Sequence, residues 1–374
     1  MYPQSRRIVR QVVALGLLVA LIALALNACG AGGQEASKKS KKSATGDGPA
    51  ATNGQIVFRR YFNADQTKGA LFTMNPDGSH IRQITHPPKG WRDDDPVWSP
   101  NGESIVFNRE KIDTSTSRLG LVNPDTRDTR EITKCTGRCV YDFNPTYSPD
   151  GRSIVFHRTV GPFVPKGEPR KTPVWKLYAA IFISGLDGSD PRQVTETPER
   201  RPGFMAQVNE PAISPDGKTL GFVRTRFEPE ENTAVFVQPI DSPGDAQQLT
   251  PWKMNCQERP EFSPDGELML FRCLPEGEEG PSNLYWVHPD GTGLHPLTNE
   301  EDGDKQYLGS SFAPSFSEGE GWITVGRTGG YGDEGNADVF RILIEEGEVV
   351  REVNLTRTEE WESNPNWSSH PPLE

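Results

Sequence analysis

Short apolar runs recur along the chain, and residues that favour turns separate them. Residues 105–107, 154–156 and 269–271 are typical, each being a run of aliphatic and aromatic side chains. A continuous apolar run of this length predicts a strand that is covered on both faces. Beyond the first 30 residues, every long segment contains Gly, Pro, Asn or Asp. The pattern therefore predicts an all-β fold of many short strands joined by tight turns.

Two short motifs alternate along the chain, and each occurs six times. The first motif, Pro-x-hydrophobic-Ser, begins at Pro96, Pro145, Pro211, Pro260, Pro314 and Pro365. The second, a hydrophobic residue followed by Thr, has its threonine at Thr85, Thr133, Thr195, Thr250, Thr298 and Thr356. In four copies the first motif continues as Pro-Asp-Gly or Pro-Asn-Gly, which suits a type I turn because Pro fixes φ at its second position. Units of roughly 50 residues with four strands each are typical of propeller blades.

The two ends of the repeat array complement each other. The first unit starts with residues 55–58 and lacks the strand of the first motif, whereas the last element, residues 364–368, consists of that strand alone. We therefore expect the C-terminal strand to join the N-terminal strands and to close a ring without a free sheet edge. A two-sheet sandwich is the alternative architecture, but it gives no reason for a repeat that is split between the termini.

These repeats resemble the WD40-like (PD40) repeats of the TolB family over residues 54–369. The resemblance implies an all-β, six-bladed β-propeller with four antiparallel strands per blade, and a binding role in the cell envelope. Two units depart from the pattern, because residues 317–319 replace the turn in one and residues 157–180 lengthen another. The chain also lacks the N-terminal α/β domain of TolB, which argues against an identical role. Residues 370–374 are expected to form a short tail.

The first 28 residues are typical of an export signal. Arg6, Arg7 and Arg10 precede an apolar run over residues 12–26 that is short for a membrane span. Residues 26–30, Leu-Asn-Ala-Cys-Gly, resemble a bacterial lipobox, which implies a lipoprotein signal peptide over residues 1–28 and lipidation of Cys29. Residues 29–53 are rich in Gly, Ala, Ser and Lys and predict a flexible tether. The alternatives are an ordinary secretory signal, a twin-arginine signal or an uncleaved anchor helix.

Four further cysteines form two close pairs. Cys135 and Cys139 lie in one loop, and Cys256 and Cys273 flank a hairpin whose turn is residues 263–266. Pairing outward from that turn brings Cys256 within a residue of facing Cys273, so a cross-hairpin disulfide is geometrically reasonable. An even number of cysteines in an exported chain favours disulfides over four free thiols.

Charge and motif content exclude several classes of function. The formal net charge is −12, although the first 52 residues are basic, so the predicted propeller is too acidic to neutralise phosphates and we expect no nucleic-acid partner. A Gly-x-Ser-x-Gly elbow, a phosphate loop and a Cys-x-x-Cys pair are all missing, and the six histidines are scattered. We therefore predict no cofactor and no metal. Asp93, Asp94 and Asp95 are weak calcium candidates, and solvated acidic residues beside Pro96 are the expected alternative.

The insertion within residues 157–180 carries aromatic and basic residues on an otherwise acidic body. Phe163, Lys166, Arg170, Lys171 and Trp175 are candidate partner-binding residues. The alternative is that the aromatic side chains pack back on the edge of the blade. The acidic loop over residues 329–338 does not follow the ligand order of an EF-hand, and we expect it to be solvated.

Together these features favour a binding scaffold, held on the outer side of the bacterial cell membrane by its N-terminal lipid. Its expected partner is an envelope protein, a peptide or a glycan, and we expect no catalysis. The alternative function is a propeller enzyme, a lyase or hydrolase acting on an envelope or extracellular polysaccharide. That alternative requires Asp, Glu, His or Arg side chains from different blades to converge on one pocket. A sensor domain is a third hypothesis.

Overall fold

The computed structural model describes residues 53–112, 116–133, 135, 138–162, 177–196, 206–226, 231–274, 282–301, 306–317, 319–329 and 336–373. The chain divides into two compact units, Met1–Gly48 and Pro49–Glu374, and every described residue belongs to the second. The predicted signal peptide, Cys29 and the tether as far as residue 52 lie outside the described residues.

The predicted all-β fold is confirmed, and its strands form antiparallel sets of four that follow the chain order. One four-stranded sheet contains β4 (Trp91–Trp98), β5 (Ile105–Lys111), β6 (Thr116–Val122) and β7 (Thr129–Glu131). Another contains β16 (Cys256–Phe262), β17 (Met269–Cys273), β18 (Asn283–Val287) and β19 (His295–Pro296). Within the described residues, the only helix is the single 3-10 turn η2 (Trp252–Met254), and no helix there has the length and apolar character needed to cross a membrane.

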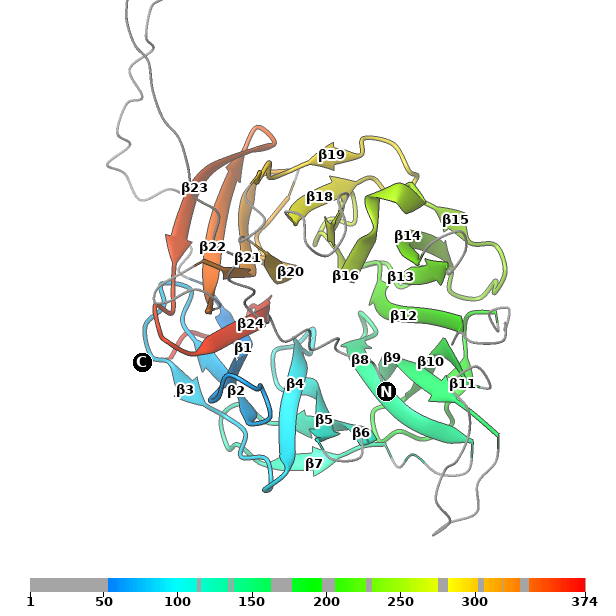
Figure 1. The fold of residues 1–374 in the computed structure, drawn as a ribbon, viewed down its shortest axis with the longest axis horizontal. Coiled ribbons are helices and arrows are strands. Elements are labelled where there is room, and N and C mark those ends of the chain that lie inside the picture. The colour runs from blue at the N-terminus through cyan, green and yellow to red at the C-terminus, as the bar shows by residue number, and fades with distance from the viewer. Residues whose placement is uncertain are drawn as a thin grey trace, which may run out of the picture. The chain divides into compact units, whose positions relative to one another are not determined.

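Two eight-stranded sheets each contain two further sets. In the first, β8 (Cys139–Tyr147), β9 (Ser153–Val160), β10 (Tyr178–Gly185) and β11 (Arg192–Gln193) precede β12 (Ala206–Ile213), β13 (Thr219–Arg226), β14 (Asn232–Pro239) and β15 (Gln247–Gln248). Only a short parallel pairing between β10 and β12 joins these two sets. Figure 1 shows that the sets follow one another around a common centre, with β4, β8, β12, β16, β20 and β24 nearest to it.

The second eight-stranded sheet brings the two ends of the unit together. It contains β20 (Tyr307–Phe312), β21 (Gly321–Thr328), β22 (Ala337–Glu345) and β23 (Glu348–Asn354), followed by β24 (Trp361–Ser368), β1 (Gln55–Tyr61), β2 (Gly69–Met74) and β3 (Arg82–Gln83). β24 pairs antiparallel with β1, so that Trp367 lies opposite Ile56. The last strand therefore completes a set of four whose other three strands are the first three of the chain.

Neighbouring strand sets pack face to face through apolar side chains. Val57 and Leu71 lie in one buried cluster with Trp98, Ile105 and Phe107 of the next set. Because each set is covered on both faces, its middle strands contain a continuous apolar run, such as residues 105–107 of β5, before polar residues follow. This explains the continuous apolar runs from which strands were predicted.

The threonine of the second motif has the same structural role in all six copies. Its hydroxyl oxygen accepts a hydrogen bond of 2.9–3.1 Å from a backbone N–H of the third strand in each set. This bond ties the short fourth strand to the third where regular pairing ends. The motif thus recurs because a buried backbone donor in every set needs an acceptor.

The prediction that the fifth copy of the first motif begins at Pro314 is wrong. Phe312 lies opposite Ile323, as Trp98 lies opposite Ile105 in the first complete set. The turn bond from Phe316 N to Ala313 O then corresponds to the bond from Gly102 N to Ser99 O. Pro314 therefore lies in the turn, and the inner strand ends before it.

Both predicted disulfides are present. Cys256 pairs with Cys273 and Cys135 pairs with Cys139. Cys256 and Cys273 lie directly opposite each other in the β16–β17 hairpin, with their Cα atoms 3.9 Å apart. Disulfides of this kind are typical of oxidising compartments.

Residues after β24 contact the strand sets. Asn75 accepts a 2.7 Å hydrogen bond from Leu373 N through Oδ1 and donates a 2.9 Å bond to Leu373 O through Nδ2. The ring of His370 stacks on Trp98 with a centroid distance of 5.1 Å. The predicted tail therefore contacts the turn between β2 and β3 and the first complete set.

Candidate functional site

A break in regular pairing occurs in each of the six strands nearest the centre. In five of these strands, the residue immediately before the first-motif proline lies at the break; these residues are Asp95, Asn144, Glu210, Arg259 and Asn364. The corresponding residue in β20 is Gly309. We call these six residues the central group. All of them except Arg259 have a positive φ. In the strand that contains Arg259, the preceding residue Glu258 has the positive φ instead. Positive φ is uncommon for residues other than Gly and is characteristic of bulges that redirect a side chain.

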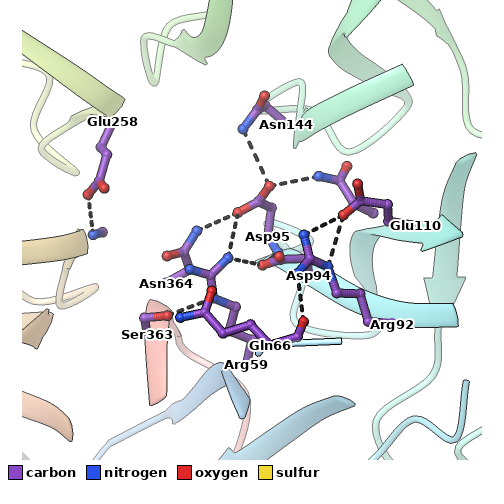
Figure 2. Close-up of polar contacts among 12 residues, drawn as sticks. Arg59, Gln66, Arg92, Asp94, Asp95, Glu110, Asn144, Glu258, Ser363 and Asn364 are labelled. Carbon is purple, nitrogen blue, oxygen red and sulfur yellow. Dashed lines mark hydrogen bonds and ion pairs between the residues drawn. The ribbon is translucent and has the colours of Figure 1, made fainter. Parts of the chain in front are cut away.

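Asp95 links three strand sets (Figure 2). Its Oδ2 accepts hydrogen bonds from Asn108 Nδ2 at 2.7 Å and from Asn144 Nδ2 at 3.4 Å, and its Oδ1 accepts one from Asn364 Nδ2. Burial, and then the negative charge of Asp94, raises the pKa of Asp95 to about 6. This carboxyl is therefore partly protonated close to neutral pH.

Glu210 and Glu258 differ in the number of carboxyl oxygens that have a hydrogen-bond or ion-pair partner. Glu258 Oε2 accepts a 2.6 Å hydrogen bond from Gly309 N, and Oε1 pairs with Arg272 Nη2 at 2.9 Å. Glu210 Oε2 is buried without a hydrogen-bond partner. Burial, followed by the charges of Glu258 and Asp95, raises the pKa of Glu210 to about 8. Carboxyl groups of three strand sets are thus electrostatically coupled.

Beside the central group, Asp94 holds a second network (Figure 2). Arg59 Nη1 forms an ion pair with Asp94 Oδ1, and Tyr61 donates a 2.6 Å hydrogen bond to Asp94 Oδ2. Arg59 also donates to Ser363 Oγ at 2.6 Å. Burial opposes ionisation of Asp94, but the guanidinium groups of Arg59 and Arg92 outweigh it and lower its pKa below the ordinary value. Asp94 therefore anchors β4 to β1.

The three consecutive aspartates have separate partners. Asp93 forms two hydrogen bonds with Arg109, at 2.7 and 2.8 Å, while Asp94 and Asp95 belong to the two networks above. The expectation that they are solvated is wrong, since the side chains of Asp93 and Asp94 are 0% and 9% exposed. The three carboxyl groups do not form one set of potential metal ligands within the described residues, since Arg109 holds the first and Arg59 lies between the other two.

Potential metal ligands gather elsewhere. Within the described part of the chain, the only group of three such side chains with ligand atoms within 4.8 Å of one another is Cys135, Cys139 and Asp142. Its two sulfur atoms are joined in a disulfide, and Asp142 forms two hydrogen bonds with Arg158. This group therefore offers no thiolate to a metal.

A pocket of about 250 Å³ lies at the ends of β4, β16, β20 and β24. Its walls include Trp98, Glu261, Phe262, Phe312, Asn366 and Trp367, together with three prolines from the turns after β4, β16 and β20 and Pro215 from the turn after β12. Glu261 Oε1 accepts a 3.0 Å hydrogen bond from Ser311 Oγ, and burial raises the pKa of Glu261 to about 7. The pocket therefore has a mixed apolar and polar lining with one titratable group.

The sequence-based candidates are only partly represented in this site. The proposed partner-binding residues Phe163, Lys166, Arg170, Lys171 and Trp175 lie outside the described residues. The central group was missed as a site, although its signal was present in the sequence, where a polar residue precedes the motif proline in five of six copies.

No protein-family model matches the chain, and no curated protein matches it. Solved structures do resemble it. TolB from Acinetobacter baumannii has a TM-score of 0.58 and 18% identity, covering 86% of this chain and 68% of that one. Hydrazine synthase from Kuenenia stuttgartiensis has a TM-score of 0.60 and 12% identity, covering 86% and 48%.

A third similar structure is an oligogalacturonate lyase in complex with manganese, with a TM-score of 0.51 and 12% identity, covering 83% of each chain. At these identities the likeness concerns the fold alone. The chain is similar to TolB-like β-propeller proteins, and structures with different activities share that architecture.

Proposed function

We propose that the protein is an extracytoplasmic binding scaffold built on a six-bladed β-propeller. Each antiparallel set of four strands is one blade, and β24 closes the ring by pairing with β1. The register of Trp367 opposite Ile56 and the order of the sets around a common centre (Figure 1) support this architecture. Such closure protects the sheet edges that an open array would expose.

The proposed location follows from the N-terminal sequence and the disulfides. Cys29 is the proposed lipidation site after removal of residues 1–28, and the lipid holds the protein on the bacterial cell membrane. The pairs Cys135–Cys139 and Cys256–Cys273 support export, because such bonds persist outside the reducing cytosol.

The pocket beside Trp98 and Trp367 is the observation that carries the binding role. Its walls come from four strands that are far apart in the sequence, so a ligand there recognises the assembled fold rather than one segment. Aromatic, proline and carboxyl groups together suit a ligand with an apolar body and a polar end. The proposed partner is a segment of an envelope protein, a peptide or a glycan.

One observation favours an enzyme as the second candidate. Asp95 and Glu210 belong to different strand sets, are electrostatically coupled, and have pKa values raised to about 6 and about 8. Carboxyl groups titrating near neutral pH suit general acid–base catalysis. The alternative is then a lyase or hydrolase that acts on an envelope or extracellular polysaccharide.

Capture of partners from solubilised envelope tests the scaffold role, with the full-length protein in detergent as bait. Ser369 lines the pocket and is exposed, so Ser369→Trp should fill the pocket and abolish capture. Ser189→Trp places the same side chain at an exposed turn position and should leave capture intact. A variant lacking residues 163–176 tests docking at the insertion.

The outcomes separate the candidates. Loss of a specific partner with Ser369→Trp alone supports docking in the pocket, whereas loss with the deletion alone moves docking to the insertion. Absence of any specific partner, combined with turnover of a glycan library that Glu210→Gln abolishes, would replace the scaffold by the enzyme.

A further inference from the structure

Among the described residues, the guanidinium group of Arg259 and one carboxyl oxygen of Glu210 in the central group have no hydrogen-bond partner. Among the described residues, Arg259 makes no hydrogen bond or ion pair, although its positive charge acts on Glu210, Asp95 and Glu261. Glu210 Oε2 is buried and likewise has no partner. A buried acceptor without a donor is rare in folded proteins and calls for an explanation.

Arg259 and Glu210 lie close enough to influence each other without being joined. The positive charge of Arg259 opposes the increase in the pKa of Glu210 and also acts on Asp95. Even so, neither a hydrogen bond nor an ion pair connects Arg259 to Glu210. The two groups therefore present a donor and an acceptor that are separated within one site.

Most other charged groups nearby are already engaged. Arg272 pairs with Glu258 at 2.9 Å and donates a 2.7 Å hydrogen bond to Tyr307 O. Arg59 is held by Asp94. Asp95 accepts from the amides of three asparagines. Glu261 is the exception, because its Oε2 is buried without a partner and the charge of Arg259 acts on it. Among the described residues, no ion pair joins Arg259 to either Glu210 or Glu261.

The site is partly exposed around its buried acceptor. The side chains of Asp95 and Glu258 are 16% and 28% exposed, and Asn144, Glu210, Arg259 and Asn364 are all half-buried. The Oε2 atom of Glu210 itself is buried, so an ammonium group contacts that oxygen only when neighbouring side chains shift. A ligand at the central group is thus partly desolvated, which strengthens charge-assisted hydrogen bonds relative to water.

We propose that the central group binds a zwitterionic ligand, whose carboxylate lies on Arg259 and whose ammonium group lies on Glu210. This inference rests on the proposed binding role and specifies the chemistry of the ligand. Arginine presents a planar fork that matches a carboxylate, and Asp95 adds a second negative group near the ammonium. A bare metal cation fits less well, because Arg259 repels it.

The protonation state of Glu210 provides a specific test of the inference. Since burial first, and then Glu258 and Asp95, raise the pKa of Glu210 to about 8, this carboxyl is mostly protonated at pH 7 before the ligand binds. An ammonium group favours the ionised form, so binding transfers the carboxyl proton to the buffer. The enthalpy of binding at pH 7 should then depend on the ionisation enthalpy of the buffer.

Three probes of similar size separate the charges: 4-aminobutyrate, butylamine and butyrate. Calorimetry with the full-length protein in detergent, in phosphate and in Tris at pH 7, measures affinity and proton release. We expect 4-aminobutyrate to bind at least about tenfold more tightly than either singly charged probe, since each of those probes lacks one of the two charge-assisted bonds.

Substitutions at Arg259 and Glu210 test which side chain binds each end of the ligand. Arg259→Met should lower the affinity for 4-aminobutyrate about tenfold or more and remove its advantage over butylamine, and Arg259→Lys should restore part of it. Glu210→Gln should remove both the advantage over butyrate and the proton release. Arg351→Met and Glu359→Gln, at exposed positions, are the matched controls and should change neither quantity.

Equal affinity for the three probes, or a preference for 4-aminobutyrate that survives Arg259→Met or Glu210→Gln undiminished, would overturn the inference. Circular dichroism establishes whether each variant is folded, and Glu210→Gln keeps the test decisive if the methionine variant is not. Capture of an envelope partner that depends on Ser369 but not on Arg259 would leave the scaffold intact while refuting this ligand chemistry.

Discussion

Glu210→Gln replaces a carboxyl group whose charged form the fold disfavours. Burial, followed by the charges of Glu258 and Asp95, raises its pKa from the ordinary 4.5 to about 8. Between these two pH values the folded protein holds a proton that the unfolded chain has released. The free energy of unfolding must therefore fall as the pH rises through this window, and Glu210→Gln removes this group's share of that fall.

The size of this change in the free energy of unfolding follows from the width of the pH window. A full difference of one bound proton changes the free energy of unfolding by about 1.4 kcal/mol per pH unit. From pH 5 to pH 7 the wild-type protein should thus lose up to about 3 kcal/mol through Glu210. Asp95 and Glu261, with pKa values raised to about 6 and about 7 mainly by burial, add slopes of the same sign, but both remain in the variant.

Urea unfolding followed by tryptophan fluorescence, at pH 5, 6 and 7, measures this difference. The stability of Glu210→Gln relative to wild type should rise by about 2–3 kcal/mol between pH 5 and pH 7. Glu359→Gln, at an exposed position, should follow the wild type throughout. Parallel curves for Glu210→Gln and wild type would refute the proposed protonation of Glu210.

Three further substitutions test the fold. Replacing Cys256 and Cys273 together by Ser should lower the free energy of unfolding by about 3 kcal/mol in urea without reductant, and an unchanged midpoint would contradict a constraining role for that disulfide. A Cβ at Gly120 would lie 2.5 Å from the ring of Phe107, so Gly120→Ala should cost about 1–3 kcal/mol, measurable as a lower Tm. Trp367→Ala should cost about 3–5 kcal/mol in the same assay, and a Tm within error of wild type would exclude β24 as a structural strand.

Local patterns in the sequence predicted most of the strands. The apolar run over residues 105–107 becomes β5, the turn over residues 263–266 connects β16 to β17, and Cys256 faces Cys273 as its distance from that turn indicated. These features depend on neighbouring residues, whose backbone preferences and side-chain alternation act over a few positions. The misaligned fifth copy at Pro314 shows the limit, because only pairing with β21 fixed the register of Phe312.

The sequence by itself thus determined an all-β repeat array and its cysteine pairs, while the tertiary structure alone decided the site. Asp95, Glu210 and Arg259 are more than a hundred residues apart at their extremes, and only the packing of successive strand sets brings their charges within reach of one another. The raised pKa values have much the same origin, since burial is the first cause of each and the charges of Glu258 and Asp95, distant in the sequence, add to it at Glu210. Long-range electrostatics and desolvation depend on three-dimensional distances, which periodicity along a chain does not encode.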